Sequence, residues 1–233
     1  MARLPEKIAA GVYRLDAIRF PNAINVLLLE NDDGWTLVDT GLEGEASRIR
    51  DALAALGSGP EDLKRIFLSH HHGDHIGGLE GLREWAPEAE LGATEYEALV
   101  VSGKLPPAAP TNPILRRMTD RESMPITPVG KILREGDLVS GFRIISTPGH
   151  SLGHVSLLRD ADGLLFTADA FGCLPRKIRV GVIKPFCIDP PMARRSAEKL
   201  LGERFDTVVM GHGPVLRADA KARLQRAVER CRY

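Results

Sequence analysis

The residues best suited to chemistry are concentrated in one short stretch, SHHHGDHIGG, at positions 69–78. Four of the seven histidines stand there, together with Asp74. Each buried polar group costs about 1–3 kcal/mol unless it has a partner, so this cluster would make a poor core. Neutral imidazoles and carboxylates are ligands that borderline divalent metals prefer. The stretch therefore predicts a metal site.

The spacing of these residues indicates which side chains share a direction. The stretch follows RIFLS at 65–69, which has the apolar character of a buried strand. Extended backbone points alternate side chains the same way, so we expect His70 and His72 to point together, with His71 turned away. Asp74 and His75 then come round at the start of a helix. The resulting pattern, H-x-H-x-D-H, presents two pairs of donors to one cavity.

The other histidines stand at the ends of predicted strands, beside glycines. His150 and His154 lie in STPGHSLGH, and His212 lies in MGHG. Asp169 closes the apolar strand GLLFTADA, where a carboxylate without a partner would be costly. Because loops at strand ends gather site residues from distant parts of a sequence, we expect these side chains to join the first cluster.

The elements that must position these residues form strand groups with helices after them. Such groups occur twice, in halves of similar size, which two sheets packed face to face with helices outside would bury. We therefore expect a single domain over 1–233. The predicted strands are 12–20, 24–32, 35–41, 65–69, 89–93, 142–150, 154–160, 163–170 and 206–213; the predicted helices are 45–56, 77–86, 95–103, 193–203 and 218–231.

Two irregular segments, 104–130 and 171–191, are predicted to be lids or binding loops. The first carries six of the sixteen prolines and has no sustained hydrophobic period. The second begins with Phe171 and includes Arg176 and Lys177. Apolar surface with a few cations suits a substrate that has an apolar portion and an anionic group, so we predict these three residues to bind substrate. Solvated charges on an ordinary loop are the alternative.

Composition and charge exclude several other classes of protein. The 31 basic residues are balanced by 31 acidic ones, so the general electrostatic footprint of a nucleic-acid binder is missing. The longest nearly continuous apolar run, 23–29, is too short for a membrane span, and the N-terminus lacks the apolar stretch of a secretory signal. Three cysteines cannot all pair internally. We expect a cytoplasmic protein that acts on a small molecule, and leave its oligomeric state open.

Five motifs together make this chain similar to a known family. They stand in the family's order and at family-like spacings, and the chain resembles the metallo-β-lactamase-fold hydrolases over essentially its whole length. The resemblance implies an α/β fold, an αββα four-layer sandwich, with a dinuclear metal site at one edge. The motifs are LVDTG at 37–41, SHHHGDHIGG at 69–78, TPGHSLGH at 147–154, FTADA at 166–170 and MGHG at 210–213.

The resemblance also implies a ligand set. One metal would be held by His70, His72 and His150; the other would be held by Asp74, His75 and His212; Asp169 would bridge the two.

Several further residues are expected to lie around these ligands. Asp39 would accept a hydrogen bond that orients a ligand imidazole, with a turn-capping role as the alternative. His154 would support its neighbours by hydrogen bonding, and Cys173 would be a small buried hydrophobe or line the pocket.

Two divalent ions would supply the chemistry. We expect zinc, with iron or manganese as alternatives, and a shared water whose pKa falls towards roughly 7. The hydroxide would attack a carbonyl or phosphoryl centre, and Asp74 would be the catalytic residue that orients it or relays its proton. This mechanism needs no serine nucleophile, because a water activated by the metals would be the attacking group.

Differences between this sequence and the better-known members of the family reduce the number of activities that we expect. β-Lactamases of this fold generally lack an aspartate at the position of Asp169, and lactonases often place a tyrosine where Ala170, Phe171 and Gly172 stand. The stretch 213–233 is too short for the helical domain of glyoxalase II enzymes, and no basic arm of the RNA-processing type is visible. We expect hydrolysis of a carboxylic ester, thioester or lactone. The alternatives are a persulfide dioxygenase-like oxygenase with one iron, a phosphodiesterase and, least favoured, a non-catalytic binding module.

Overall fold

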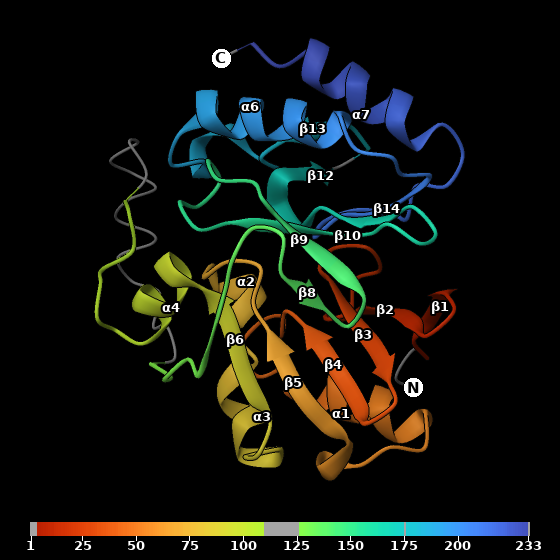
Figure 1. Ribbon diagram of the computed structural model, residues 1–233, viewed down its shortest axis with the longest axis vertical. Helices are drawn as coiled ribbons and strands as arrows, with labels where there is room; N and C mark the ends of the chain where they lie inside the picture. Colours follow the sequence, from red (N-terminus) through yellow and green to blue (C-terminus); the bar gives the residue numbers. More distant parts are fainter. Residues whose placement is uncertain (1–3, 110–125, 175, 233) are drawn as a thin grey trace. The chain divides into compact units, whose positions relative to one another are not determined.

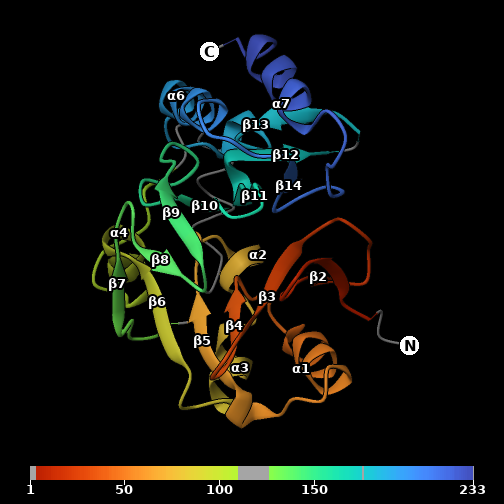
Figure 2. The same ribbon diagram turned by 45° about the vertical axis from the view of Figure 1, so that its right-hand side comes forward.

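The computed structural model describes residues 4–109, 126–174 and 176–232. The chain divides into two compact units (Figures 1 and 2). The first holds the described residues of 1–105 and 123–133, and the second holds those of 106–122 and 134–233. Each unit is a β-sheet with helices packed against it. Whether 1–233 forms a single domain depends on how the units are joined, and that stays a prediction.

The first unit contains a mixed sheet of seven strands among the described residues. The strands follow one another in chain order, antiparallel from β1 to β4 and parallel from β4 to β7. The parallel half places the carboxyl ends of β4 and β5 at the same edge of the sheet, where the first candidate residues follow. The strands are β1 (Glu6–Ala9), β2 (Val12–Asp16), β3 (Asn25–Asn31), β4 (Gly34–Val38), β5 (Leu63–Phe67), β6 (Glu90–Thr94) and β7 (Lys131–Leu133).

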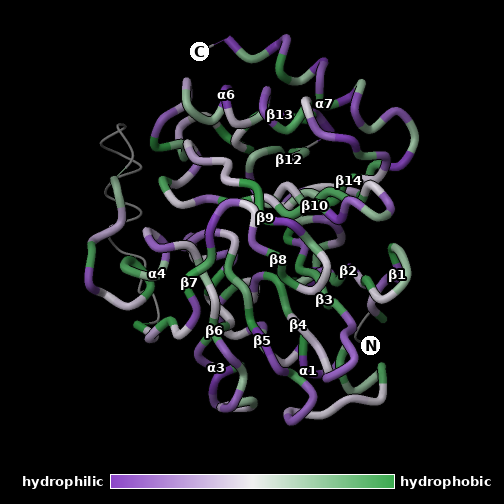
Figure 3. Tube along the Cα trace, in the orientation of Figure 1, coloured by the Kyte–Doolittle hydropathy of each residue, from purple (hydrophilic) through white to green (hydrophobic). Residues whose placement is uncertain are grey.

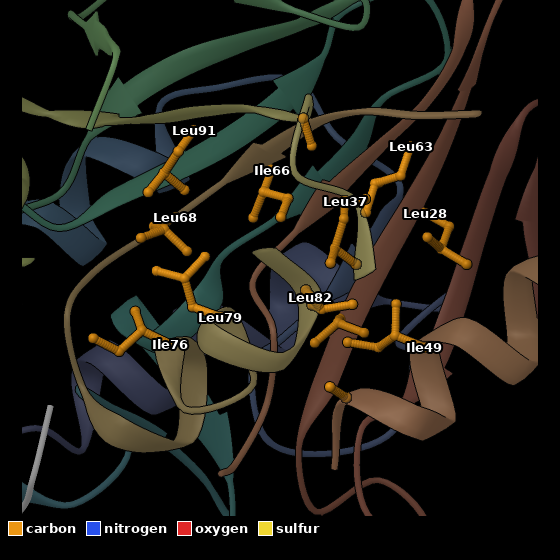
Figure 4. Packing of buried hydrophobic residues seen from close by; sticks show 14 of the residues in the cluster. Leu28, Leu37, Ile49, Leu63, Ile66, Leu68, Ile76, Leu79, Leu82 and Leu91 are labelled. Atoms are coloured by element: carbon orange, nitrogen blue, oxygen red, sulfur yellow. The ribbon is translucent and has the colours of Figure 1, made fainter. Parts of the chain in front are cut away.

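Helices of the first unit bury one face of this sheet. Apolar side chains of α1 and α3 pack on residues such as Leu28, Leu37 and Ile66 of the central strands (Figure 4). Removing this surface from water is the main stabilisation of the unit, at about 25 cal/mol per Å². A short 3-10 turn, Pro60–Asp62, leads into β5. The helices are α1 (Ala46–Ala55), α2 (Gly73–Ile76), α3 (Leu79–Trp85) and α4 (Glu95–Val101).

The second unit contains a five-stranded sheet and a separate two-stranded hairpin among its described residues. The larger sheet has the order β14-β11-β10-β9-β8, antiparallel except where β11 pairs with β14. β12 and β13 form the hairpin. The strands are β8 (Leu138–Val139), β9 (Phe142–Ser146), β10 (Val155–Arg159), β11 (Leu164–Phe166), β12 (Phe171–Cys173), β13 (Ile178–Val180) and β14 (Thr207–Val209).

Two amphipathic helices cover the hairpin side of this unit, α6 (Pro190–Leu201) and α7 (Ala220–Glu229). Hydrophobic and hydrophilic stretches alternate along α7 (Figure 3), and its buried residues include Leu224 and Val228. These pack with Leu165 and Val208 of the sheet in one apolar cluster. Short 3-10 turns at Ala168–Ala170 and Lys184–Phe186 connect the elements. Each described helix of the chain is too short or too polar to cross a lipid bilayer.

The structure corrects the prediction that 171–191 is irregular throughout. The β12–β13 hairpin lies within it, and α6 begins at Pro190 rather than at 193. Proline is tolerated in a first helical turn, where its missing N–H would have no intrahelical partner, and Asp189 caps the helix by accepting from the Met192 N–H at 2.8 Å. In the other predicted lid segment, 104–130, residues 110–125 lie outside the described residues.

Candidate metal centre

Four of the predicted ligands lie together in the first unit, in the loop after β5 and in α2. The ring centroid of His70 is 4.7 Å from that of His72 and 4.1 Å from that of His75. Asp74 places a carboxylate oxygen 3.9 Å from Nε2 of His75. His70 and His75 are buried, whereas the Asp74 side chain is 34% exposed. We call His70, His72, Asp74 and His75 the first donor cluster.

Asp39, directly after β4, holds this cluster in place. It is fully buried, with φ +63°, a left-handed conformation that aspartate tolerates better than most residues. Its carboxylate accepts hydrogen bonds from the Ser69 N–H (2.7 Å), the Ser69 hydroxyl (2.7 Å) and Nδ1 of His75 (2.8 Å). Because the proton of His75 then sits on Nδ1, the neutral ring carries its lone pair on Nε2, ready to bind a metal.

Ser69 fixes the proton position of His70 in the same way. Its hydroxyl donates to Asp39, so it accepts from Nδ1 of His70 at 3.0 Å. His70 therefore also carries its lone pair on Nε2. Ser69 was not among the predicted site residues. The sequence feature that could have indicated it is its position as a polar residue at the end of an apolar strand, immediately before the histidines.

Gly77 and Gly78, which end the stretch 69–78, allow the loop after β4 to lie directly on α2. The Thr40 N–H donates to the carbonyl of His75 at 2.6 Å, and the Gly78 N–H donates to that of Gly41 at 3.2 Å. A β-carbon at Gly77 would lie 2.3 Å from the Glu43 nitrogen, and one at Gly78 would lie 2.4 Å from the Thr40 oxygen. Any larger residue would push α2, and with it the first donor cluster, away from Asp39.

His71 is engaged elsewhere in the same unit. Its Nδ1 lies 2.5 Å from a carboxylate oxygen of Glu97 on α4, and both side chains are buried. Glu97 was missed by sequence analysis because one glutamate in a helix carries no pattern.

The second unit brings three more predicted ligands together. Asp169, in the turn after β11, places one carboxylate oxygen 3.3 Å from Nε2 of His150 and 3.3 Å from Nε2 of His212. His150 follows β9, and His212 follows β14. All three side chains are buried. We call them the second donor cluster.

A directed chain of hydrogen bonds positions Asp169. Its N–H donates to Nε2 of His154 (3.0 Å), so the proton of this ring sits on Nδ1 and is donated to the Thr147 hydroxyl (2.9 Å). Thr147 in turn bonds Ser156 (3.0 Å), which donates to the carbonyl of Thr167 (3.2 Å). Both ring nitrogens of His154 are thus used to hold the turn around Asp169. Thr147 was not predicted.

The predicted residues around the ligands have different environments. Phe171 is fully buried in the apolar core of the second unit, so core packing replaces the substrate contact predicted for it. Cys173 is buried in the same core. Arg176 and Lys177 are exposed at the closed end of the β12–β13 hairpin, and their substrate contact stays a prediction.

A buried thiol also lies near the second donor cluster. Sγ of Cys187 lies 3.9 Å from Nδ1 of His150. Burial, together with the Asp169 carboxylate, raises the pKa of the Cys187 thiol to about 12. It is therefore protonated at neutral pH, and protonated thiols are poor nucleophiles and poor metal ligands.

Comparisons with known proteins agree on one family. The family model for the metallo-beta-lactamase superfamily matches residues 19–212. The chain is 29% identical to the uncharacterized protein YobT of Bacillus subtilis, over 90% of this chain and 91% of that protein, and 28% identical to the probable metallo-hydrolase YflN of the same organism, over 88% and 84%. A hydroxyacylglutathione hydrolase of Cereibacter sphaeroides is 36% identical, but over 48% of this chain and 36% of that enzyme.

A solved structure shows the same architecture. The metallo-β-lactamase MIM-1 of Novosphingobium pentaromativorans superposes with a TM-score of 0.74 at 21% identity, over 97% of this chain and 87% of that one. At that identity the likeness shows the fold alone. The chain belongs to the metallo-β-lactamase superfamily, and its mixed α/β fold is of that type. It is a metal-dependent hydrolase of this class.

The donor chemistry fits the divalent metals bound in this superfamily. Both clusters consist of imidazoles and carboxylates, the ligand types of zinc, iron and manganese sites. Hydrogen bonds at Nδ1 orient His70 and His75 so that Nε2 is their metal-binding atom.

Proposed function

We propose that the two donor clusters together bind two divalent metal ions and that the chain hydrolyses a carboxylic ester, thioester or lactone. The observation that carries the proposal is the position of Asp169. One of its carboxylate oxygens lies 3.3 Å from Nε2 of His150 and 3.3 Å from Nε2 of His212. A cation held among these groups would offset the cost of burying them. In the proposed assignment, one ion is held by His70, His72 and His150, the other by Asp74, His75 and His212, and Asp169 bridges them.

The bound ions would lower the pKa of a water to roughly 7 and polarise the scissile carbonyl. Zinc is the expected metal. Iron and manganese are alternatives, because imidazole and carboxylate ligands without a thiolate accept all three metals. Asp74 is the proposed catalytic residue, because its carboxylate is partly exposed and reaches to 3.9 Å from the Nε2 of His75. It would accept the proton of the attacking water and pass it on. Asp39 and Ser69 would hold His70 and His75 as neutral bases towards the metals.

Support for an acyl substrate comes from the relatives. The hydroxyacylglutathione hydrolases are named for a thioester substrate, and the Cereibacter sphaeroides enzyme aligns over 118 residues. The chain spans 36% of that enzyme. We therefore propose for this chain only the chemical class of the enzyme's substrate, an acyl compound. We extend the proposal to a small-molecule substrate and a cytoplasmic location, the latter because three cysteines, an odd number, cannot all pair in disulfides.

A substrate panel tests the acyl preference. The zinc-loaded enzyme is expected to turn over acyl esters, thioesters or lactones with a higher kcat/KM than bis-phenyl phosphodiesters, because a hydroxyacylglutathione hydrolase is among its relatives. The same panel is run with manganese- and iron-loaded enzyme, with oxygen uptake on a persulfide as a further arm. A higher kcat/KM on phosphodiesters with each metal would overturn the substrate class. Oxygen consumption by an enzyme with one iron would instead identify an oxygenase.

A further inference from the structure

A second chemically distinctive feature of the chain is a basic pocket between the β12–β13 hairpin and α7. The pocket has a volume of about 280 Å³ and is lined by Arg176, Lys177, Ile178, Arg223, Arg226 and Arg230. β13 and α7 lie side by side (Figures 1 and 2). Five of the six lining residues are cations, none is acidic, and no proposed metal ligand is among them. We call these six residues the basic pocket.

The concentration of charge is local. The chain as a whole has a formal net charge of zero. Other arginines of the second unit form ion pairs: Arg143 with Asp160, Arg159 with Asp162 and Arg194 with Glu198. The acidic residue of α7, Glu229, accepts a hydrogen bond from Gln225 and does not line the pocket. Like charges held this close repel one another, so an anion among them would stabilise the folded chain.

Helix electrostatics explain only part of this arrangement. Cations are favourable in the last turn of a helix, which accounts for Arg226 and Arg230. Arg223 stands in the first turn of α7, where the helix dipole disfavours a cation. Arg176 and Lys177 belong to a different element and converge on the same space. The spacing of 223, 226 and 230 places the three arginines on one face of the helix, towards the hairpin.

We propose that the basic pocket binds a multiply charged phosphate group of a small molecule, a di- or triphosphate. Guanidinium groups hold phosphate oxygens through paired, charge-assisted hydrogen bonds, and several are needed for several phosphates. The pocket volume is close to the lower end of the range for small-molecule sites, which suits a phosphate chain rather than a large apolar ligand. Nothing in this proposal depends on the metal centre.

Calorimetric titration of the full chain with inorganic pyrophosphate, inorganic triphosphate and a nucleoside triphosphate tests the proposal. All three are expected to bind, triphosphate more tightly than pyrophosphate, and more weakly as salt is raised. The double variant Arg223→Gln with Arg226→Gln should weaken binding about tenfold or more, since hydrogen bonds between charged groups are lost. Tighter binding of the nucleoside triphosphate would identify a nucleotide as the source of the phosphates.

A matched control removes the same charge elsewhere in the second unit. Arg134→Gln with Arg204→Gln changes two exposed arginines that do not line the pocket, and should leave the dissociation constants unchanged. Melting temperatures of both double variants check folding. Glutamine has a helix propensity close to that of arginine, so the variant in α7 is expected to melt near the wild-type temperature. Equal weakening by both variants, or absence of binding by all three probes, would overturn the proposal. So would tighter binding to a DNA duplex than to triphosphate.

Discussion

Replacing Asp169 with asparagine is expected to lower kcat/KM about 1000-fold, because several kcal/mol of transition-state stabilisation depend on the metals that it bridges. One carboxylate oxygen of Asp169 meets both His150 and His212, and an amide at this position would be a much weaker metal ligand. The variant should also retain less metal than the wild-type chain. Activity on the best acyl substrate and metal content by mass spectrometry measure the two effects.

The fold should survive this substitution. The bond from Asp169 to His154 uses the backbone N–H, which asparagine keeps, and the apolar cluster of the second unit does not include the side chain. Circular dichroism and melting temperature check this. Asp206→Asn, an exposed aspartate of the same unit, is the matched control and should leave activity unchanged. Full activity of Asp169→Asn with two bound metals would show that another group makes the bridge.

Asp39→Asn is expected to weaken zinc binding about 10–100-fold, the usual effect of removing a hydrogen-bond partner of a metal ligand. Asparagine can keep the left-handed backbone and accept from Ser69, but its NH₂ group cannot also accept from Nδ1 of His75. The proton of His75 would then move to Nε2 and block the metal-binding atom. Competition with a chelator of known affinity measures the change.

Two further variants separate orientation from folding. Ser69→Ala should give a smaller loss than Asp39→Asn, because it removes the partner of His70 while the Asp39–His75 bond remains. Asp51→Asn, an exposed residue of α1 in the same unit, should leave zinc affinity unchanged. An unchanged zinc affinity in a folded Asp39→Asn chain would assign Asp39 the turn-capping role alone.

Long periodic elements were predictable from the sequence. The helix predicted at 45–56 is α1 (Ala46–Ala55), because a regular apolar period stops just before a glycine. The spacing H-x-H-x-D-H indicated which histidines share a direction, and the rings of His70 and His72 lie 4.7 Å apart. Asp74 and His75 were predicted at the start of the following helix, whereas the structure places them in a separate four-residue helix, α2, before α3.

Short elements and partners from distant positions were not predictable. β12 and β13 have three residues each, too few to show an alternation, so the segment read as irregular. Phe171 begins the segment 171–191, whose mixture of apolar residues and cations predicted substrate contact, whereas β12 buries its side chain in the apolar core. Ser69, Thr147 and Glu97 act through hydrogen bonds that tertiary structure creates, and isolated polar residues carry no periodic signal.

The number of metal ions bound per chain tests the dinuclear centre most directly. Purified chain saturated with zinc and freed of excess metal is analysed by mass spectrometry against protein concentration, and anomalous scattering from crystals of the same sample locates the ions. Two zinc ions per chain, one beside His70, His72 and His150 and the other beside Asp74, His75 and His212, are the predicted result. A single ion at saturation, or two ions with Asp169 bound to neither, would contradict it.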